Sequence, residues 1–250
     1  GLGSRLPSRG TSWKVTYSSR PSAPPRRNPV DMIVECLGLP GSGKTSLLRA
    51  LRAARDPSFR FVAVRTLPER LAWFALGWML HPVVAVRFMA CLVGQPPALR
   101  RYLFHLWTVS LAATAKAEAC QAFCPRRILF LDEGILQRAL SVCDAPAFPA
   151  LEQALAPWLR SRACLLVEGG GFERFGTAHG ASTHPRLQAG AAAFQRWEGA
   201  ATATCQRFFA CIRQTGRAIA VPNAGRPPWD ALLPLVRRDL RRFMEPAGKP

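Results

Sequence analysis

Five short apolar runs occur along the chain, and longer stretches with helical periodicity separate them. Each run is bounded by charged residues, Gly or Pro, which is typical of strands buried on both faces of a sheet. The runs are residues 32–37, 61–64, 128–131, 163–167 and 218–221. Because strands that alternate with helices form parallel sheets, the pattern predicts an α/β fold with a five-stranded parallel sheet and helices on both faces.

The helical stretches predict how the rest of the chain is arranged around this sheet. They are residues 45–55, 71–80, 83–92, 99–119, 135–142, 150–160, 191–214 and 229–243. Three of them fall between the second and third strands, so we expect a helical insertion over about 67–120. Residues 169–190 are rich in Gly, Ser, Thr and His, which predicts a mobile loop within a lid over about 169–196. We expect one domain over residues 31–250, preceded by a disordered basic leader over residues 1–30.

The segment 71–94 is apolar and about long enough to cross a bilayer. However, His81 and Pro82 interrupt it, and Arg87 lies in its second half. Proline ends or kinks a helix, and a charged side chain inside a membrane is costly. We therefore expect two buried helices that meet at Pro82, and not a membrane span. His105 lies in another apolar helical stretch, so we expect it in the core.

The charge balance favours anionic partners. The chain has 34 Lys and Arg residues against 15 Asp and Glu residues, which gives a net charge of +19. Such a field attracts nucleotides, phosphorylated small molecules, nucleic acid or acidic membranes, and it does not choose among them. A nucleic-acid partner is supported by charge alone.

The cysteines and the leader bear on the compartment. Eight cysteines occur without any C-x-x-C pair, and several lie within apolar runs. In a chain of this length they predict reduced, buried thiols and a cytoplasmic protein. The leader is rich in Arg and contains no acid, so organelle targeting stays open as an alternative.

The strongest motif is Gly-Leu-Pro-Gly-Ser-Gly-Lys-Thr at residues 38–45. It follows the first predicted strand and precedes a helix, which is the context of a phosphate-binding loop. Glycines let the backbone amides turn inward, and the helix N-terminus adds partial positive charge beside them. We expect the loop to bind a nucleoside triphosphate, most simply ATP with Mg²⁺.

Individual roles follow from this chemistry. Lys44 supplies a charge to the β and γ phosphates, and the Thr45 hydroxyl binds Mg²⁺. The predicted nucleotide-binding residues are Gly38, Leu39, Pro40, Gly41, Ser42, Gly43, Lys44, Thr45 and Ser46.

A second motif is acidic and lies at the end of the third predicted strand. There, Ile-Leu-Phe-Leu is followed by Asp132, Glu133 and Gly134. Ligands of open α/β sheets collect at the carboxyl ends of the strands, and a carboxylate there can bind Mg²⁺ directly or through water. We expect Asp132 to belong to the metal site. Glu133 is a candidate general base, or alternatively a charge that stabilises a helix N-terminus.

Together these residues resemble the small P-loop kinases, a group that includes thymidylate-kinase-like and adenylate-kinase-like proteins. The resemblance rests on residues 38–46, on Arg65 after the second strand, and on Leu-Asp-Glu-Gly-Ile-Leu-Gln-Arg at 131–138. It implies a three-layer P-loop NTPase fold with a lid. It also implies transfer of a phosphoryl group from ATP to a nucleotide or another small acceptor.

The resemblance further implies roles for three arginines. Arg65 stands where such kinases often hold the acceptor. Arg174 and Arg186 are the candidates for lid arginines that clamp the transferring phosphate, although their spacing differs from the usual lid pattern. The alternative for each is a solvated surface charge.

Two further segments have open interpretations. Residues 222–226 either touch the base of the nucleotide, as similarly placed loops in the resembled fold do, or form a turn into the last helix. That helix carries Arg237, Arg238, Arg241 and Arg242, which face either an anionic partner or solvent.

A kinase is the leading functional hypothesis, and two alternatives remain. An ATP-hydrolysing switch would also use acidic residues at a strand end. A nucleotide-binding module without turnover is compatible with the unusual lid spacing. The Leu-Ser-Gly-Gly-Gln motif of transporter ATPases and the Asn-Lys-x-Asp motif of GTPases do not occur in the sequence.

Overall fold

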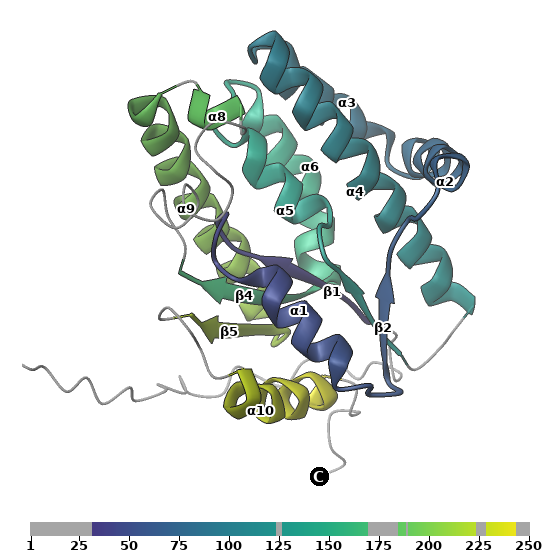
Figure 1. The fold of residues 1–250 in the computed structure, drawn as a ribbon. Helices are drawn as coiled ribbons and strands as arrows, with labels where there is room; N and C mark the ends of the chain where they lie inside the picture. The colour runs from purple at the N-terminus through teal and green to yellow at the C-terminus, as the bar shows by residue number, and fades with distance from the viewer. Residues whose placement is uncertain (1–31, 124–126, 170–184, 189, 224–228, 244–250) are drawn as a thin grey trace, which may run out of the picture.

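The sheet of this protein, in a computed structural model, has five parallel strands in the order β2-β3-β1-β4-β5 (Figure 1). The structure describes residues 32–123, 127–169, 185–188, 190–223 and 229–243. The strands are β1 (Met32–Leu37), β2 (Phe59–Val62), β3 (Ile128–Leu131), β4 (Ala163–Glu168) and β5 (Ala218–Pro222). The α/β class and the five-stranded parallel sheet are therefore confirmed. The leader over residues 1–30 and most of the expected lid lie outside the described residues.

The helices follow the predicted stretches closely except for α8, a single turn that lies within the segment 169–190 expected to be a loop. They are α1 (Lys44–Ala53), α2 (Leu67–Leu80), α3 (Pro82–Val93), α4 (Pro97–Phe123), α5 (Ile135–Ala139), the 3₁₀ turn η1 (Leu140–Val142), α6 (Phe148–Ser161), α8 (Pro185–Gln188), α9 (Ala191–Gln214) and α10 (Trp229–Arg242). The main difference concerns β2, which begins and ends two residues before the predicted 61–64. Its register explains this, because Val62 pairs with Leu131, the last residue of β3, and the ladder ends there.

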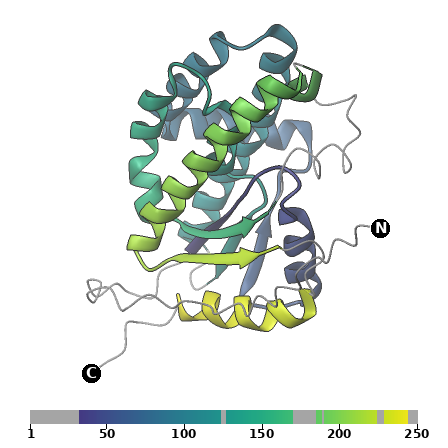
Figure 2. The ribbon, with the colours of Figure 1, turned by 90° about the vertical axis from the view of Figure 1, so that its left-hand side faces the viewer.

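Helices cover both faces of the sheet (Figures 1 and 2). Alternate residues of β1 point to opposite faces. On one face, Val34 and Cys36 pack with residues of α1 and α10 in one hydrophobic cluster. On the other face, Ile33 packs with residues of α4, and Leu37 joins a larger cluster built from α3 to α6 and α9. β1 is buried along its whole length because it is central and covered on both sides.

The first of the three helices between β2 and β3, α2, is less buried than predicted. Only Gly77 is buried in α2, where it lies against Leu111 of α4. Leu71 and Met79 are 58% and 71% exposed, so the prediction of two buried helices is wrong for α2. The reason is that α2 contacts α4 along one side only, and its outer side has no described neighbour. His105 is also exposed, contrary to the expectation of a core position.

The break at Pro82 is present, and α2 and α3 are bent there by 106°. Among the described helices, none is by itself long and apolar enough to cross a membrane. The pair α2 and α3 reaches the required length and composition only when the two bent helices are taken together.

The described cysteines are free thiols. Cys36, Cys91, Cys164 and Cys205 are buried, as predicted, whereas Cys211 is exposed on α9. Burial raises the pKa of the Cys205 thiol to about 11. This thiol is therefore inert at neutral pH and acts as a small apolar side chain.

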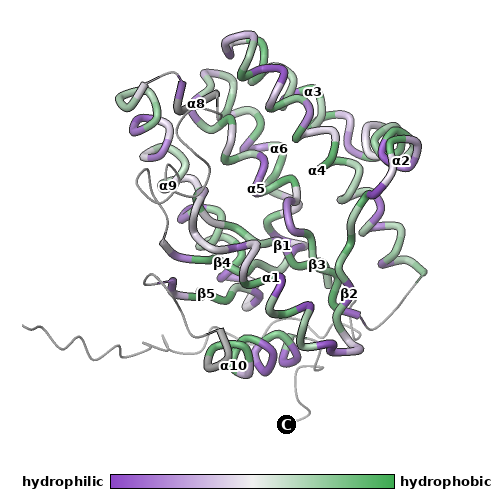
Figure 3. Tube along the Cα trace, viewed as in Figure 1, coloured by the Kyte–Doolittle hydropathy of each residue, from purple (hydrophilic) through white to green (hydrophobic). Residues whose placement is uncertain are grey.

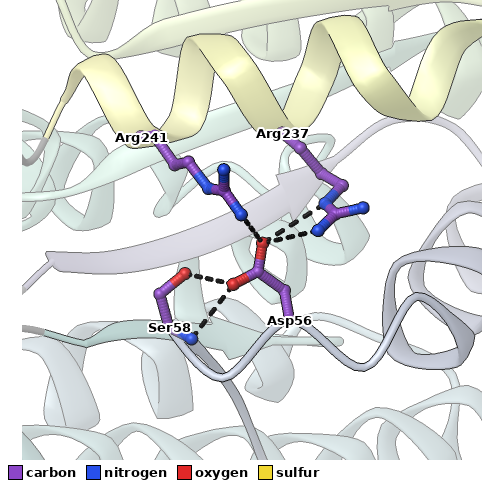
Figure 4. A network of polar contacts seen from close by, with 4 residues as sticks. All are labelled: Asp56, Ser58, Arg237 and Arg241. Atoms are coloured by element: carbon purple, nitrogen blue, oxygen red, sulfur yellow. Dashed lines mark hydrogen bonds and ion pairs between the residues drawn. The ribbon is translucent and has the colours of Figure 1, made fainter.

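A buried carboxylate attaches α10 to the rest of the fold (Figure 4). Asp56 precedes β2, and its side chain is 1% exposed. It accepts hydrogen bonds from the amide and hydroxyl of Ser58, from Arg237 at 2.9 Å and from Arg241 at 2.6 Å. Burial alone would raise the pKa of Asp56, but the bonds from Ser58, Arg237 and Arg241 outweigh it and lower that pKa below its usual range. Two of the four arginines of α10 thus have a structural role.

We predict that Asp56→Asn lowers the free energy of unfolding by about 1–3 kcal/mol at neutral pH, because it breaks a buried charge-assisted network. The folded-state pKa of Asp56 is lowered, so its stabilisation is complete above the unfolded pKa of about 4 and is lost as the pH falls further. Urea unfolding of wild type and variant at several pH values measures this difference, which should shrink in acid.

The control is Asp239→Asn, which removes the more exposed partner of Arg238 and Arg242. It should change stability by less than about 1 kcal/mol. Equal effects of the two substitutions at all pH values would contradict the structural role of Asp56.

Candidate functional site

The loop of residues 38–45 leaves the carboxyl end of β1 at the centre of the sheet and leads into α1. Its glycines Gly38, Gly41 and Gly43 have φ values of 151°, 77° and 93°, which residues other than Gly rarely adopt. A Cβ atom at Gly38 would also lie 2.6 Å from the carbonyl oxygen of Val167 in β4. Glycine is therefore required at Gly38 for conformation and for space.

Lys44 lies on the inner side of this loop. Its Nζ donates hydrogen bonds to the carbonyl oxygens of Gly38 at 2.8 Å and of Leu39 at 3.0 Å. Burial lowers the pKa of the Lys44 ammonium, and the nearby Glu133 carboxylate partly offsets this. The next residues, Thr45 and Ser46, begin α1 and are exposed. The loop thus presents one ammonium and two hydroxyls at a helix N-terminus.

Two amide side chains fix the backbone of the loop. Gln137 of α5 accepts a hydrogen bond from the Gly38 amide and donates one to the Gly38 carbonyl oxygen, both at 3.1 Å. Asn223, the residue after β5, donates to the carbonyl oxygen of Ser42. The segment 222–226 is therefore close to the loop at Asn223, and residues 224–226 lie outside the described residues.

The acidic strand end lies beside the loop because β3 pairs with β1. In the register of the two strands, Glu35 of β1 pairs with Leu131, the last residue of β3. Asp132 therefore follows beside the end of β1, just before the loop begins. Burial is the main cause that raises the pKa of Asp132; Glu133 raises it further, and Lys44 opposes this. Glu133 forms an ion pair with Arg138 of α5. The structure thus brings the predicted residues Lys44, Asp132 and Glu133 together.

A buried carboxylate in β1 positions the start of α5. Glu35 is fully buried and accepts a hydrogen bond from the amide of Leu136 at 2.9 Å. Burial raises the pKa of Glu35 to about 6, although Arg162 and the backbone amides of α5 oppose this. A Cβ atom at Gly134 would lie 2.1 Å from Oε2 of Glu35. Gly134 is therefore needed to let α5 begin directly on this carboxylate.

The loop, α4 and α5 surround a cavity of about 770 Å³. Its lining comes from the loop and α1, from α4, and from the chain between β3 and α9. The lining residues are Pro40, Gly41, Gly43, Lys44, Thr45, Ser46, Arg49, Tyr102, Leu103, Leu106, Glu133, Gln137, Arg138, Ser141, Arg186 and Trp197. Four of these are basic and one is acidic, so the cavity suits an anion. Tyr102, Leu103 and Leu106 form a more apolar wall.

The three arginines predicted for the site differ in their positions. Arg186 is buried and lines the cavity, where its guanidinium binds Asp144 at 2.9 Å and lies 4.7 Å from the centre of the Trp197 ring. Arg65 is exposed and is not among the described residues that line the cavity. Arg174 lies outside the described residues. Asp132, although electrostatically coupled to Lys44, is not part of the described cavity wall either.

Sequence analysis did not assign roles to several cavity residues, among them Gln137, Arg138, Tyr102 and Trp197. Gln137 and Arg138 belong to residues 131–138, on which the resemblance to P-loop kinases rests. Their closeness to Asp132 in the sequence was the one indication that they could belong to the site. Arg138 is held by the hydroxyl of Ser110 at 3.3 Å, a contact across 28 residues that no local pattern indicates. Tyr102 likewise lies on a long helix whose orientation the sequence does not reveal.

Comparisons with known proteins do not add a family assignment. No protein-family model matches the chain, and no curated protein matches it. Within the described residues, no group of three or more His, Cys, Asp or Glu side chains is arranged to hold a metal ion. The loop, the acidic strand end and the cavity are therefore the features that indicate a function.

The contact between Gly134 and Glu35 gives a stability prediction. Gly134→Ala should lower the free energy of unfolding by about 1–3 kcal/mol, because a methyl group must displace either the buried carboxylate or α5. Gly199→Ala is the matched control, since a Cβ atom there meets no atom within 4 Å and Gly199 lies inside α9.

The control should be neutral or more stable by up to about 1 kcal/mol, because Ala favours helix over Gly. Chemical unfolding of both variants makes the comparison. If Gly134→Ala were as stable as Gly199→Ala, the close packing of α5 on Glu35 would be incorrect.

Proposed function

We propose that the protein is a P-loop nucleoside-triphosphate-binding protein of the small kinase type, which transfers a phosphoryl group from ATP to a small acceptor. The observation that carries this proposal is the loop of residues 38–45 at the carboxyl end of the central strand. It joins three glycines with positive φ to Lys44 and opens onto a basic cavity. A structural turn between a strand and a helix needs neither this ammonium nor the cavity.

The loop fits the polyphosphate of a nucleotide. Glycine at Gly38, Gly41 and Gly43 allows the backbone to approach phosphate oxygens closely, and α1 directs its N-terminal amides to the same place. Lys44 lies where its ammonium can exchange the carbonyl oxygens of Gly38 and Leu39 for β- and γ-phosphate oxygens. The cavity volume lies in the range typical of small-ligand sites, about 300–1,000 Å³.

Thr45 and Asp132 are the residues that would hold Mg²⁺. Magnesium at nucleotide sites is held by one or two protein oxygens together with phosphates and water, so a cluster of protein ligands is not needed. The bound ion would neutralise charge on the β and γ phosphates. Burial and the Glu133 carboxylate raise the pKa of Asp132, and the Lys44 ammonium opposes this shift, as a bound Mg²⁺ would.

The acceptor would bind beside the part of the cavity wall that α5, α8 and α9 supply. This part contains Arg138 and Arg186, whose guanidinium groups are held by Glu133 and Asp144, and the flat Trp197 ring. Arginines fixed in this way bind anionic oxygens with little loss of side-chain entropy. They would orient the acceptor toward the γ phosphate and balance the charge that spreads over the transferring group.

The ion pair between Glu133 and Arg138 fits a kinase, because it can hold a guanidinium toward an anionic acceptor. The Glu133 carboxylate keeps further lone pairs besides the one that accepts from Arg138, so Glu133 could also act as a general base toward an acceptor hydroxyl. In the kinase, the same pair orients an arginine toward the acceptor.

The release of ADP from Mg-ATP, measured with and without a panel of nucleotide and small hydroxyl acceptors, tests the reaction. Release that depends on an acceptor supports the kinase. Equal release of ADP without any acceptor would contradict the kinase and indicate an ATPase. Binding of ATP without any release would leave a module that binds nucleotide and has no turnover.

Nucleotide binding itself is tested with Lys44→Ala. We predict that Mg-ATP raises the Tm of the wild type and that this shift is lost in the variant, because the loop ammonium supplies much of the phosphate affinity. Thermal unfolding with and without Mg-ATP measures the shift.

The control is Lys116→Ala on α4. It removes an ammonium that is bound to Glu69 and to the carbonyl oxygen of Ala63. Its own Tm can fall, but its shift with Mg-ATP should remain. A full shift in Lys44→Ala would show that the nucleotide does not bind at this loop.

A further inference from the structure

The outer surface of α2 and α3 is apolar and uncovered among the described residues. Large side chains recur on it at helical spacing, and Figure 3 colours α2 mostly hydrophobic. They are Leu67, Leu71 and Met79 on α2 and Val83, Val86 and Val93 on α3. We call this set the α2–α3 face. Monomeric proteins rarely expose a contiguous apolar surface of this kind unless it has a function.

The two helices hold this face in a fixed shape. Exposed Met79 and Val83 lie on either side of the bend at His81, where α2 ends and α3 begins. The His81 ring bonds Glu118 of α4 at 2.7 Å and packs edge-on against Trp158 of α6. Arg162 binds the other oxygen of the same carboxylate. The bend is therefore anchored on α4 and α6.

Basic residues outnumber acidic ones in the stretch of chain that contains β2, α2, α3 and α4. Residues 60–123 contain seven basic residues and two acidic ones. Both acids are already in ion pairs, Glu69 with Lys116, and Glu118 with His81 and Arg162. Arg87 is exposed one helical turn from Val83, and Arg65 is exposed just before α2. An apolar surface among unbalanced cations matches an anionic lipid surface, where side chains enter the headgroup region and arginines meet phosphates.

We infer that the α2–α3 face binds the surface of an anionic lipid bilayer, with α2 and α3 lying in the interface and the rest of the protein outside it. Self-association through the same face is disfavoured, because it would bring two sets of unbalanced arginines together. The face lies at the opposite end of the molecule from α10 (Figures 1 and 2), so the arginines of α10 take no part in it.

Vesicle binding of the full chain tests this inference and does not depend on nucleotide binding. The probes are vesicles of phosphatidylcholine with phosphatidylserine and vesicles of phosphatidylcholine alone, in a flotation assay. We expect binding to the former, a decrease with added salt, and weak binding to the latter.

The variant is Leu71→Glu with Met79→Glu, which places two carboxylates on the face without touching the core. It should weaken binding to the anionic vesicles by about tenfold or more. The control is Leu235→Glu, an exposed apolar residue of α10, which should bind as the wild type does. Circular-dichroism melting checks that each variant is folded.

Three results would overturn the inference. The first is that the wild type does not bind the anionic vesicles, and the second is that the double variant binds them as well as the control. The third is a wild-type dimer that the double variant converts to a monomer in light scattering, which would assign the face to a second copy of this chain.

Discussion

The arrangement around the cavity depends on the carboxylate of Glu35, which is buried in the middle of the central strand. A buried carboxylate is costly unless hydrogen bonds compensate it, and here the amide of Leu136 at the start of α5 does so in part, since burial still raises the pKa of Glu35. This contact fixes where α5 begins, and α5 carries Gln137 and Arg138. Gln137 in turn holds Gly38, and Arg138 holds Glu133. One buried acid thus positions the loop and the opposite cavity wall relative to each other.

Most of the fold could be predicted because the sheet is central and its strands are continuous apolar runs. β1 and β3 were predicted with their observed bounds, since both faces of each are covered and every residue is buried. β2 is an edge strand, and its bounds depend on its register with β3, which a single sequence does not reveal. The burial of α2 was predicted wrongly because apolar composition does not show whether a neighbour is present to cover it.

The candidate site could be predicted only where the chemistry is local. Residues 38–45 and Asp132 with Glu133 are contiguous motifs, so their types and spacing indicate their chemistry. The second half of the cavity is assembled from residues that are far apart, such as Tyr102, Arg138, Arg186 and Trp197. Arg65 and Arg186 were both assigned to the site from the resemblance. Arg186 lines the described cavity, and Arg65 does not. Only packing distinguishes the two.

The pair of hydrogen bonds between Gln137 and Gly38 also has a mechanical consequence. Both the amide and the carbonyl group of Gly38 are bound to a single side chain, so the loop backbone cannot rotate there while α5 stays still. α5 continues directly into η1, and Ser141 of η1 accepts a hydrogen bond from Arg186. A displacement of the Gly38 backbone would therefore be transmitted through α5 and η1 to Arg186, which lines the same cavity.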